Sequence, residues 1–395
     1  MMADRRSRLL LCVAVLTLVW LQTPAGVDAC PFCSEERGPT LVGDFNQASL
    51  VLLGTFANFK PNLGNDLGGT TEFFVEKALK PHEVLKGRNK VTFNKAVPAT
   101  KGKYIVFCDV YKGEIDPYRG VEVPADSDLV SYLTESLAKR DRPAGERLRL
   151  AFNYLTSSDL EVSMDAYREF AKADYKDYKD MAKSLPADTI GKWLQDPKTP
   201  AYRYGLYASL LGHCGNPEKH GNLLRTLLDD PEKRKGSGID GMLASYVMLQ
   251  PKEGWKYVKG LLNNAEEEFL IRYAALRTAR FLWGERPDLL PQGELVAGVA
   301  QSLAHPDMAD FVIEDLRKWQ RWELSDRILN LFEQETHNVP VIRRAILRYA
   351  LRCPNPRAAS FVREQRRLDA DWVNDAEELL RLEQEAPVEV PAKTR

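Results

Sequence analysis

The pattern of hydrophobic and polar positions changes character once along the chain, near Pro124. Between Ala48 and Val123, apolar residues form short runs rich in β-branched and aromatic side chains, separated by turn-forming stretches such as NLGNDLGG. Runs of this kind predict β-strands. The strand-like segments are SLVLLGTF, TEFFVEKALK, NKVTFNKAV and KYIVFCDVY. They predict four or five strands of a small antiparallel barrel, because a parallel sheet needs long helices between its strands.

A short helix is predicted just before these strands. It begins near Pro39, a residue favoured in the first turn of a helix. Leu41, Val42, Phe45 and Ala48 then fall on one face of the helix.

After Pro124 the apolar residues follow a helical period for the rest of the chain. Leu129, Val130, Leu133 and Leu137 have helical spacing, and further helices follow them. The fold class expected is therefore α+β multidomain, with a small N-terminal antiparallel β-barrel followed by an all-α region.

Three segments of the helical region resemble one another. Each has an Arg followed by small and apolar residues, and then a break at Gly or Pro. They are YRYGLYASLLGHCGNPEKHGNLLRTLL, LIRYAALRTARFLWGERPDLLP and VIRRAILRYALRCPNPRAASFV, with the shared arginine at Arg203, Arg272 and Arg343. Their spacing leaves room for one more unit in each gap, filled by helices predicted to start near Ile239 and Ala309. A repeat of about 35 residues, each a helix pair, is typical of a stacked solenoid.

These units resemble HEAT repeats, in which a first helix with the Arg-small-apolar pattern leads through a turn into a second helix such as GNLLRTLLDD. The resemblance covers residues 201–385 and implies an α-solenoid. An irregular helical bundle is the alternative.

The start of the chain has the layout of a secretory signal. Basic residues at Arg5, Arg6 and Arg8 precede an apolar run, Leu9 to Leu21, that is too short to cross a bilayer. Cleavage after residue 29 would export a soluble protein of bacterial type that begins with Cys30, located in the periplasm, outside the cell or on its surface. A lipid anchor on Cys30 is a less favoured alternative, because a polar stretch separates the apolar run from this cysteine.

The motif Cys30-Pro31-Phe32-Cys33 has several interpretations. A redox couple would need a preceding strand and a following helix to lower the thiol pKa, and a zinc site would need two further ligands. The favoured interpretation is structural. Cys30, Cys33 and Cys108 are the disulfide candidates, with Cys30 joined to Cys108 as the preferred pair.

The order of landmarks from CPFC through FNQASLVLLGTF to KYIVFCDVY is similar to the netrin-like module of tissue inhibitors of metalloproteinases. The resemblance covers residues 30–124 and implies an OB-fold barrel. It also implies an alternative function, a metalloprotease inhibitor or metal chelator acting through Cys30. The spacing Cys-x-x-Cys departs from the family's Cys-x-Cys, which weakens that alternative.

Composition excludes some functions. The chain has 55 basic and 56 acidic residues, so no overall charge favours nucleic acid. Signature motifs for catalysis, nucleotides or cofactors are missing, and His82-Glu83 lacks the second His of a zinc protease motif. No catalytic residue, cofactor or metal ligand is therefore predicted.

One charge pattern stands out near the C-terminus. Arg344, Arg348 and Arg352 repeat every four residues opposite an apolar face, so they form a basic stripe on one helix. A solvated face is the simpler interpretation, and a surface for an anionic partner is the functional one.

The expected organisation is a signal peptide at 1–29, an OB or netrin-like barrel at 30–124, a helical connector at 125–200, HEAT-like repeats at 201–385 and a disordered tail at 386–395. The leading hypothesis is an exported, non-catalytic scaffold whose solenoid surface binds a protein partner. A thiol oxidoreductase using Cys30 and Cys33 is a further alternative.

Overall fold

The computed structural model describes residues 38–61, 68–97, 101–234 and 236–385. The predicted signal peptide, Cys30, Cys33 and the predicted tail at 386–395 lie outside these residues.

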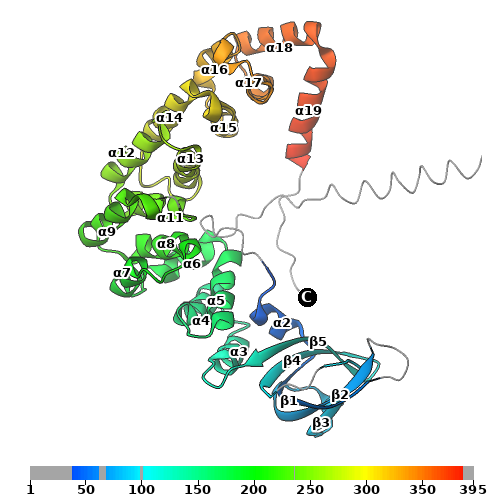
Figure 1. The fold of residues 1–395 in the computed structure, drawn as a ribbon. Helices are drawn as coiled ribbons and strands as arrows, with labels where there is room; N and C mark the ends of the chain where they lie inside the picture. The colour runs from blue at the N-terminus through cyan, green and yellow to red at the C-terminus, as the bar shows by residue number, and fades with distance from the viewer. Residues whose placement is uncertain (1–37, 62–67, 98–100, 235, 386–395) are drawn as a thin grey trace, which may run out of the picture. The chain divides into compact units, whose positions relative to one another are not determined.

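An antiparallel sheet follows the first described helix (Figure 1). Its strands are β1 (Leu50–Pro61), β2 (Gly69–Lys80), β3 (Lys90–Phe93), β4 (Lys103–Tyr111) and β5 (Glu114–Val123), in the spatial order β3-β2-β1-β4-β5. The four predicted strand segments correspond to β1, β2, β3 and β4, whereas β5 was not among them. The predicted closed barrel was not found, because β3 and β5 are edge strands that do not pair with each other in the described part of the chain.

Both faces of the sheet are covered at its centre, which explains why β4 reads as a continuous apolar run. Four successive residues from Ile105 to Cys108 are buried. One face of the sheet encloses a core that includes Val106 and Cys108. On the other face, Phe107 meets Phe45 of the predicted helix, α2 (Leu41–Gln47), with ring centroids 6.3 Å apart.

The rest of the described chain is mainly helical. Its α-helices are α3 (Leu129–Ala138), α4 (Ala144–Tyr154), α5 (Leu160–Lys172), α6 (Tyr175–Ala182), α7 (Ala187–Gln195), α8 (Tyr204–Cys214), α9 (Pro217–Asp229), α10 (Pro231–Arg234), α11 (Ile239–Leu249), α12 (Pro251–Leu262), α13 (Phe269–Gly284), α14 (Gln292–Ala300), α15 (Pro306–Lys318), α16 (Ser325–Leu331), α17 (Pro340–Arg352), α18 (Pro356–Leu368) and α19 (Ala370–Glu385). An α+β chain with an antiparallel sheet followed by helices is thus confirmed.

The later helices are arranged in pairs. In the C-terminal part of the chain, α13, α15 and α17 form one row and α14, α16 and α18 a second row, while α19 runs alongside α17 (Figure 1). This arrangement is consistent with a helical repeat region.

The shared arginines mark equivalent places in this region. Arg203 directly precedes α8, whereas Arg272 and Arg343 are each the fourth residue of α13 and α17. The described residues divide into two compact units between Trp255 and Lys256. The domain boundaries expected from the sequence stay predictions.

Candidate functional site

Cys108 is the disulfide candidate that the structure describes. It is fully buried in the sheet core on the same face as Val106. It forms no disulfide with Cys214 or Cys353, the other cysteines in the described chain. Burial, together with nearby carboxylates, raises the pKa of its thiol to about 12, so it is a weak nucleophile. A bridge from Cys108 to Cys30 or Cys33 stays a prediction.

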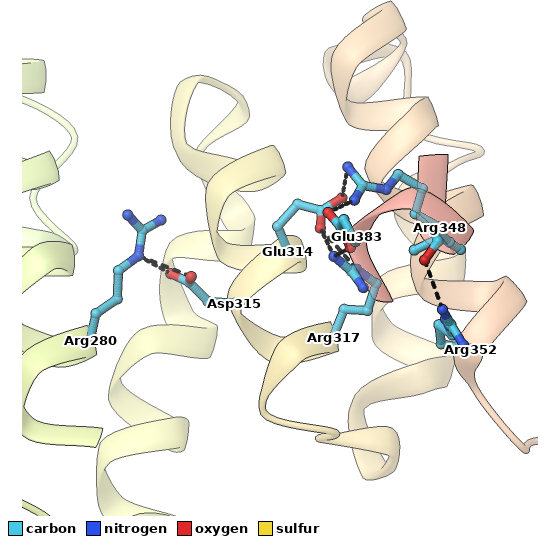
Figure 2. A network of polar contacts seen from close by, with 8 residues as sticks. Arg280, Glu314, Asp315, Arg317, Arg348, Arg352 and Glu383 are labelled. Carbon is cyan, nitrogen blue, oxygen red and sulfur yellow. Dashed lines mark hydrogen bonds and ion pairs between the residues drawn. The ribbon is translucent and has the colours of Figure 1, made fainter. Parts of the chain in front are cut away.

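The predicted arginine stripe lies on α17, and two of its members contact other helices (Figure 2). Arg348 forms ion pairs with Glu314 of α15 and Glu383 of α19. Arg352 donates to the carbonyl oxygen of Leu380 at 3.1 Å. Arg344 is exposed. An anionic partner at this stripe would therefore meet the Arg348 guanidinium already neutralised by carboxylates. The use of the stripe as a surface for an anionic partner stays a prediction.

A second arginine completes this network. Arg317 of α15 has a side chain that is only 7% exposed, and its Nη2 lies 2.7 Å from Glu314 Oε2 and 2.9 Å from Glu383 Oε2. Although partial burial opposes it, hydrogen bonds and charge from Arg348 and Arg317 hold the pKa of Glu383 below its usual value. Two carboxylates and two guanidinium groups thus fasten α19 to α15 and α17.

Replacing Glu383 with Gln should loosen α19. The change removes one of two negative charges that balance Arg317 and Arg348, and charged hydrogen bonds of this kind contribute about 1.5 kcal/mol. Amide hydrogen exchange in α19 should accelerate about tenfold, as that energy implies. Glu378→Gln is the matched control, because Glu378 lies on the same helix but pairs with Arg381 at an exposed site. Equal exchange in the two variants would contradict the proposed fastening.

A cavity of 340 Å³ lies where α2, α3, α4 and α5 meet, within the N-terminal unit. Four cations line it. Lys139 and Arg140 follow α3, Arg147 belongs to α4 and Lys172 ends α5. One carboxylate, that of Glu169, lines the same cavity. The cavity is thus a strongly positive site in a chain with almost no net charge.

These cations keep most of their charge uncompensated. Among the described residues, Lys139, Arg147 and Lys172 have no carboxylate within ion-pair distance. Arg147 donates to the carbonyl oxygen of Arg140 at 3.2 Å, and Lys172 donates to Thr40 Oγ1 at 3.3 Å. Arg140 contacts the exposed carboxylate of its neighbour, Asp141, a pair that water screens strongly.

A buried carboxylate supports the helix that forms one wall of the cavity. Asp165 is 1% exposed and accepts hydrogen bonds from the backbone N–H groups of Leu41 and Val42 at the start of α2 and from the hydroxyl of Tyr132. Burial raises the pKa of Asp165 to about 6 despite these donors. The sequence analysis missed this residue. Its signal was a carboxylate on the apolar face of α5, close to Val162 and Ala166.

A second cavity, of 430 Å³, contains a His and Asp pair. His220 Nε2 lies 3.1 Å from Asp188 Oδ1, and His220 Nδ1 accepts a hydrogen bond from the backbone N–H of Asn216 at 2.8 Å. The Nε2 proton therefore points to Asp188, and both ring nitrogens are occupied. The pair joins α7 to the start of α9 and offers no free base, so we assign it a structural role.

An aromatic cluster with a fixed arginine lies on α13 and α15, which we name the α13/α15 patch. The rings of Phe269, Tyr273 and Phe311 have centroid separations of 5.1 to 6.1 Å. Arg280 lies over the Tyr273 ring at 5.5 Å, and its Nε contacts both carboxylate oxygens of Asp315 at 2.8 and 2.9 Å. Figure 2 shows this ion pair.

The patch is partly open to solvent. Phe269 is 38% exposed and its neighbour Leu270 is 73% exposed. Aromatic residues and arginine are the residue types that contribute most to binding at protein interfaces. Because Arg280 is held by a buried carboxylate, the cluster is already ordered before any partner binds.

Comparison with known proteins adds no family to this picture. No protein-family model, no curated protein and no solved structure matches the chain. In the described residues, no helix is both long and apolar enough to cross a membrane, and no cluster of three or more potential metal ligands occurs.

Proposed function

We propose that this protein is an exported, non-catalytic binding scaffold whose helical repeats bind a protein partner. The observation that supports this proposal best is the α13/α15 patch, an ordered aromatic and arginine cluster with exposed apolar groups at its edge. Stacked helix pairs suit such a role because each contacts its neighbours and together they offer an extended surface.

The finer features of the sequence fit the same proposal. The Arg-small-apolar pattern at Arg203, Arg272 and Arg343 supports HEAT-like repeats, and the landmarks of the sheet support a netrin-like or OB-type module. The basic and apolar leader supports export.

We propose that the partner contributes an apolar segment to the patch. The single cation at its centre, Arg280, is already neutralised by Asp315. Electrostatic attraction at this place is therefore weak, and burial of Phe269, Leu270 and Phe311 would provide most of the binding energy, at about 25 cal/mol for each Å² of apolar surface.

A photo-reactive phenylalanine analogue at position 270 should crosslink the exported protein to its partner in the cells that produce it. Leu368 is the matched control position, because it is 67% exposed on α18 and lies outside the patch. The adduct should form from position 270 and not from position 368. Phe311→Ala, which removes one ring of the cluster, should reduce the yield about tenfold, a typical effect at an interface anchor.

Mass spectrometry of the adduct decides the outcome. A different protein joined through position 270 supports the proposal. Equal yields from both positions, an adduct of two copies of this chain, or no adduct would contradict it.

A further inference from the structure

We infer that the cavity between α2, α3, α4 and α5 binds a small phosphorylated organic molecule. The inference is independent of the proposed partner site, which lies on other helices. Its basis is the excess of positive charge, four cations against one carboxylate, around a partly open cavity of 340 Å³. That volume falls within the range of about 300 to 1,000 Å³ that is usual for small-molecule sites.

The placement of the cations goes beyond what the helices themselves require. Helix C-termini favour cations, which accounts for Lys139 after α3 and Lys172 at the end of α5. It does not explain why both face the same cavity as Arg140 and Arg147. Bringing like charges together costs free energy unless an anion compensates them.

The directions from which the cations approach favour a phosphate group over a carboxylate. The cations come from the turn after α3, from α4 and from α5. A tetrahedral phosphate presents oxygens in several directions, whereas a carboxylate presents two oxygens in one plane. A phosphate can therefore contact cations on all three elements at once.

The cavity also has room and a surface for an organic group. Val42, Leu150 and Ala151 contribute apolar lining beside the charged groups. A bare phosphate would leave most of this lining in contact with water. Small-molecule sites typically combine an apolar lining with a few polar groups that orient the ligand.

Isothermal titration calorimetry with phenyl phosphate, using the full chain at low ionic strength, tests the inference. We expect one binding site, tighter binding of phenyl phosphate than of inorganic phosphate, and weaker binding of benzoate. Lys139→Gln combined with Arg147→Gln should weaken binding at least tenfold. Glu169→Gln should strengthen it about threefold, because it removes the one negative charge from the cavity wall.

The matched control is Lys192→Gln, which removes a cation from the second cavity. It should leave phenyl phosphate affinity unchanged. The opposite effects of the Glu169 and Lys139/Arg147 variants separate charge recognition from loss of folding, since misfolding cannot strengthen binding.

Vesicles with and without phosphatidic acid distinguish the source of the phosphate. Binding of phenyl phosphate alone supports a free phosphorylated molecule, and additional vesicle binding that the double variant abolishes supports a lipid headgroup. Absence of phenyl phosphate binding, or equal affinity in the wild type and the double variant, would overturn the inference.

Discussion

Replacing Arg203 with Ala should lower the free energy of unfolding by about 3 kcal/mol. Arg203 is 6% exposed, and its guanidinium donates to the carbonyl oxygen of Leu155, to Tyr207 Oη at 3.1 Å and to Ser163 Oγ at 3.0 Å. The change leaves these buried acceptors without a donor and creates a cavity. Urea unfolding followed by circular dichroism measures the loss.

Arg343→Ala is the matched control, because Arg343 holds the equivalent place in the repeat. Its guanidinium lies over the Phe332 ring at 3.7 Å and contacts Asn338 in a more exposed setting. Its loss should cost about 1 kcal/mol or less. Arg203→Lys should fail to restore full stability, since an ammonium cannot reproduce the fork of the guanidinium. Equal effects at positions 203 and 343 would show that Arg203 has no special structural role.

The shared arginine illustrates what the sequence could predict. The pattern located Arg203, Arg272 and Arg343 at the start of three helices, α8, α13 and α17, because helical periodicity and Gly or Pro breaks are local signals. It could not predict their different partners. Arg272 pairs with Asp307, which lies one helix pair further along the chain.

The arginine stripe on α17 shows the same limit, that the sequence pattern does not predict the partners of a side chain. The sequence placed Arg344, Arg348 and Arg352 on one helical face correctly. Two carboxylates, those of Glu314 and Glu383, neutralise Arg348. Both are distant from it in sequence, so the periodicity within α17 gave no sign of them.

The cationic cavity was also beyond local patterns. Its cations come from three separate places in the chain, and each has the ordinary appearance of a surface residue in the sequence. The packing of α3, α4 and α5 against one another brings them together. The prediction of a closed barrel was wrong for a related reason. Local pattern predicts the strand segments, whereas closure depends on whether the two edge strands pair with each other.

Asp165 should make the stability of the N-terminal unit depend on pH in a direction opposite to that of a typical ion-paired carboxylate. Burial raises its pKa from 3.8 to about 6 in the folded protein. Between these two values the folded state holds a proton that the unfolded state has released, so the free energy of unfolding falls as the pH rises. Well above pH 6 the full effect is present, and it amounts to about 3 kcal/mol.

The comparison that isolates this effect is wild type against Asp165→Asn. An Asn side chain has the shape of the protonated carboxyl group and does not titrate. The difference in unfolding free energy, wild type minus variant, should therefore decrease by about 2 kcal/mol between pH 4 and pH 7. Urea unfolding at intervals of half a pH unit measures this difference.

The sign of the slope distinguishes two physical accounts of the site. If desolvation dominates, the difference decreases as the pH rises. If the donors at Leu41, Val42 and Tyr132 dominate instead, they stabilise the charged form, lower the folded pKa and make the difference increase with pH. A flat or rising difference would contradict the prediction. A rising difference would mean that the Asp165 carboxylate is a stabilising N-terminal cap for α2 at neutral pH. A falling difference would mean that its negative charge weakens the fold at the wall of the cationic cavity.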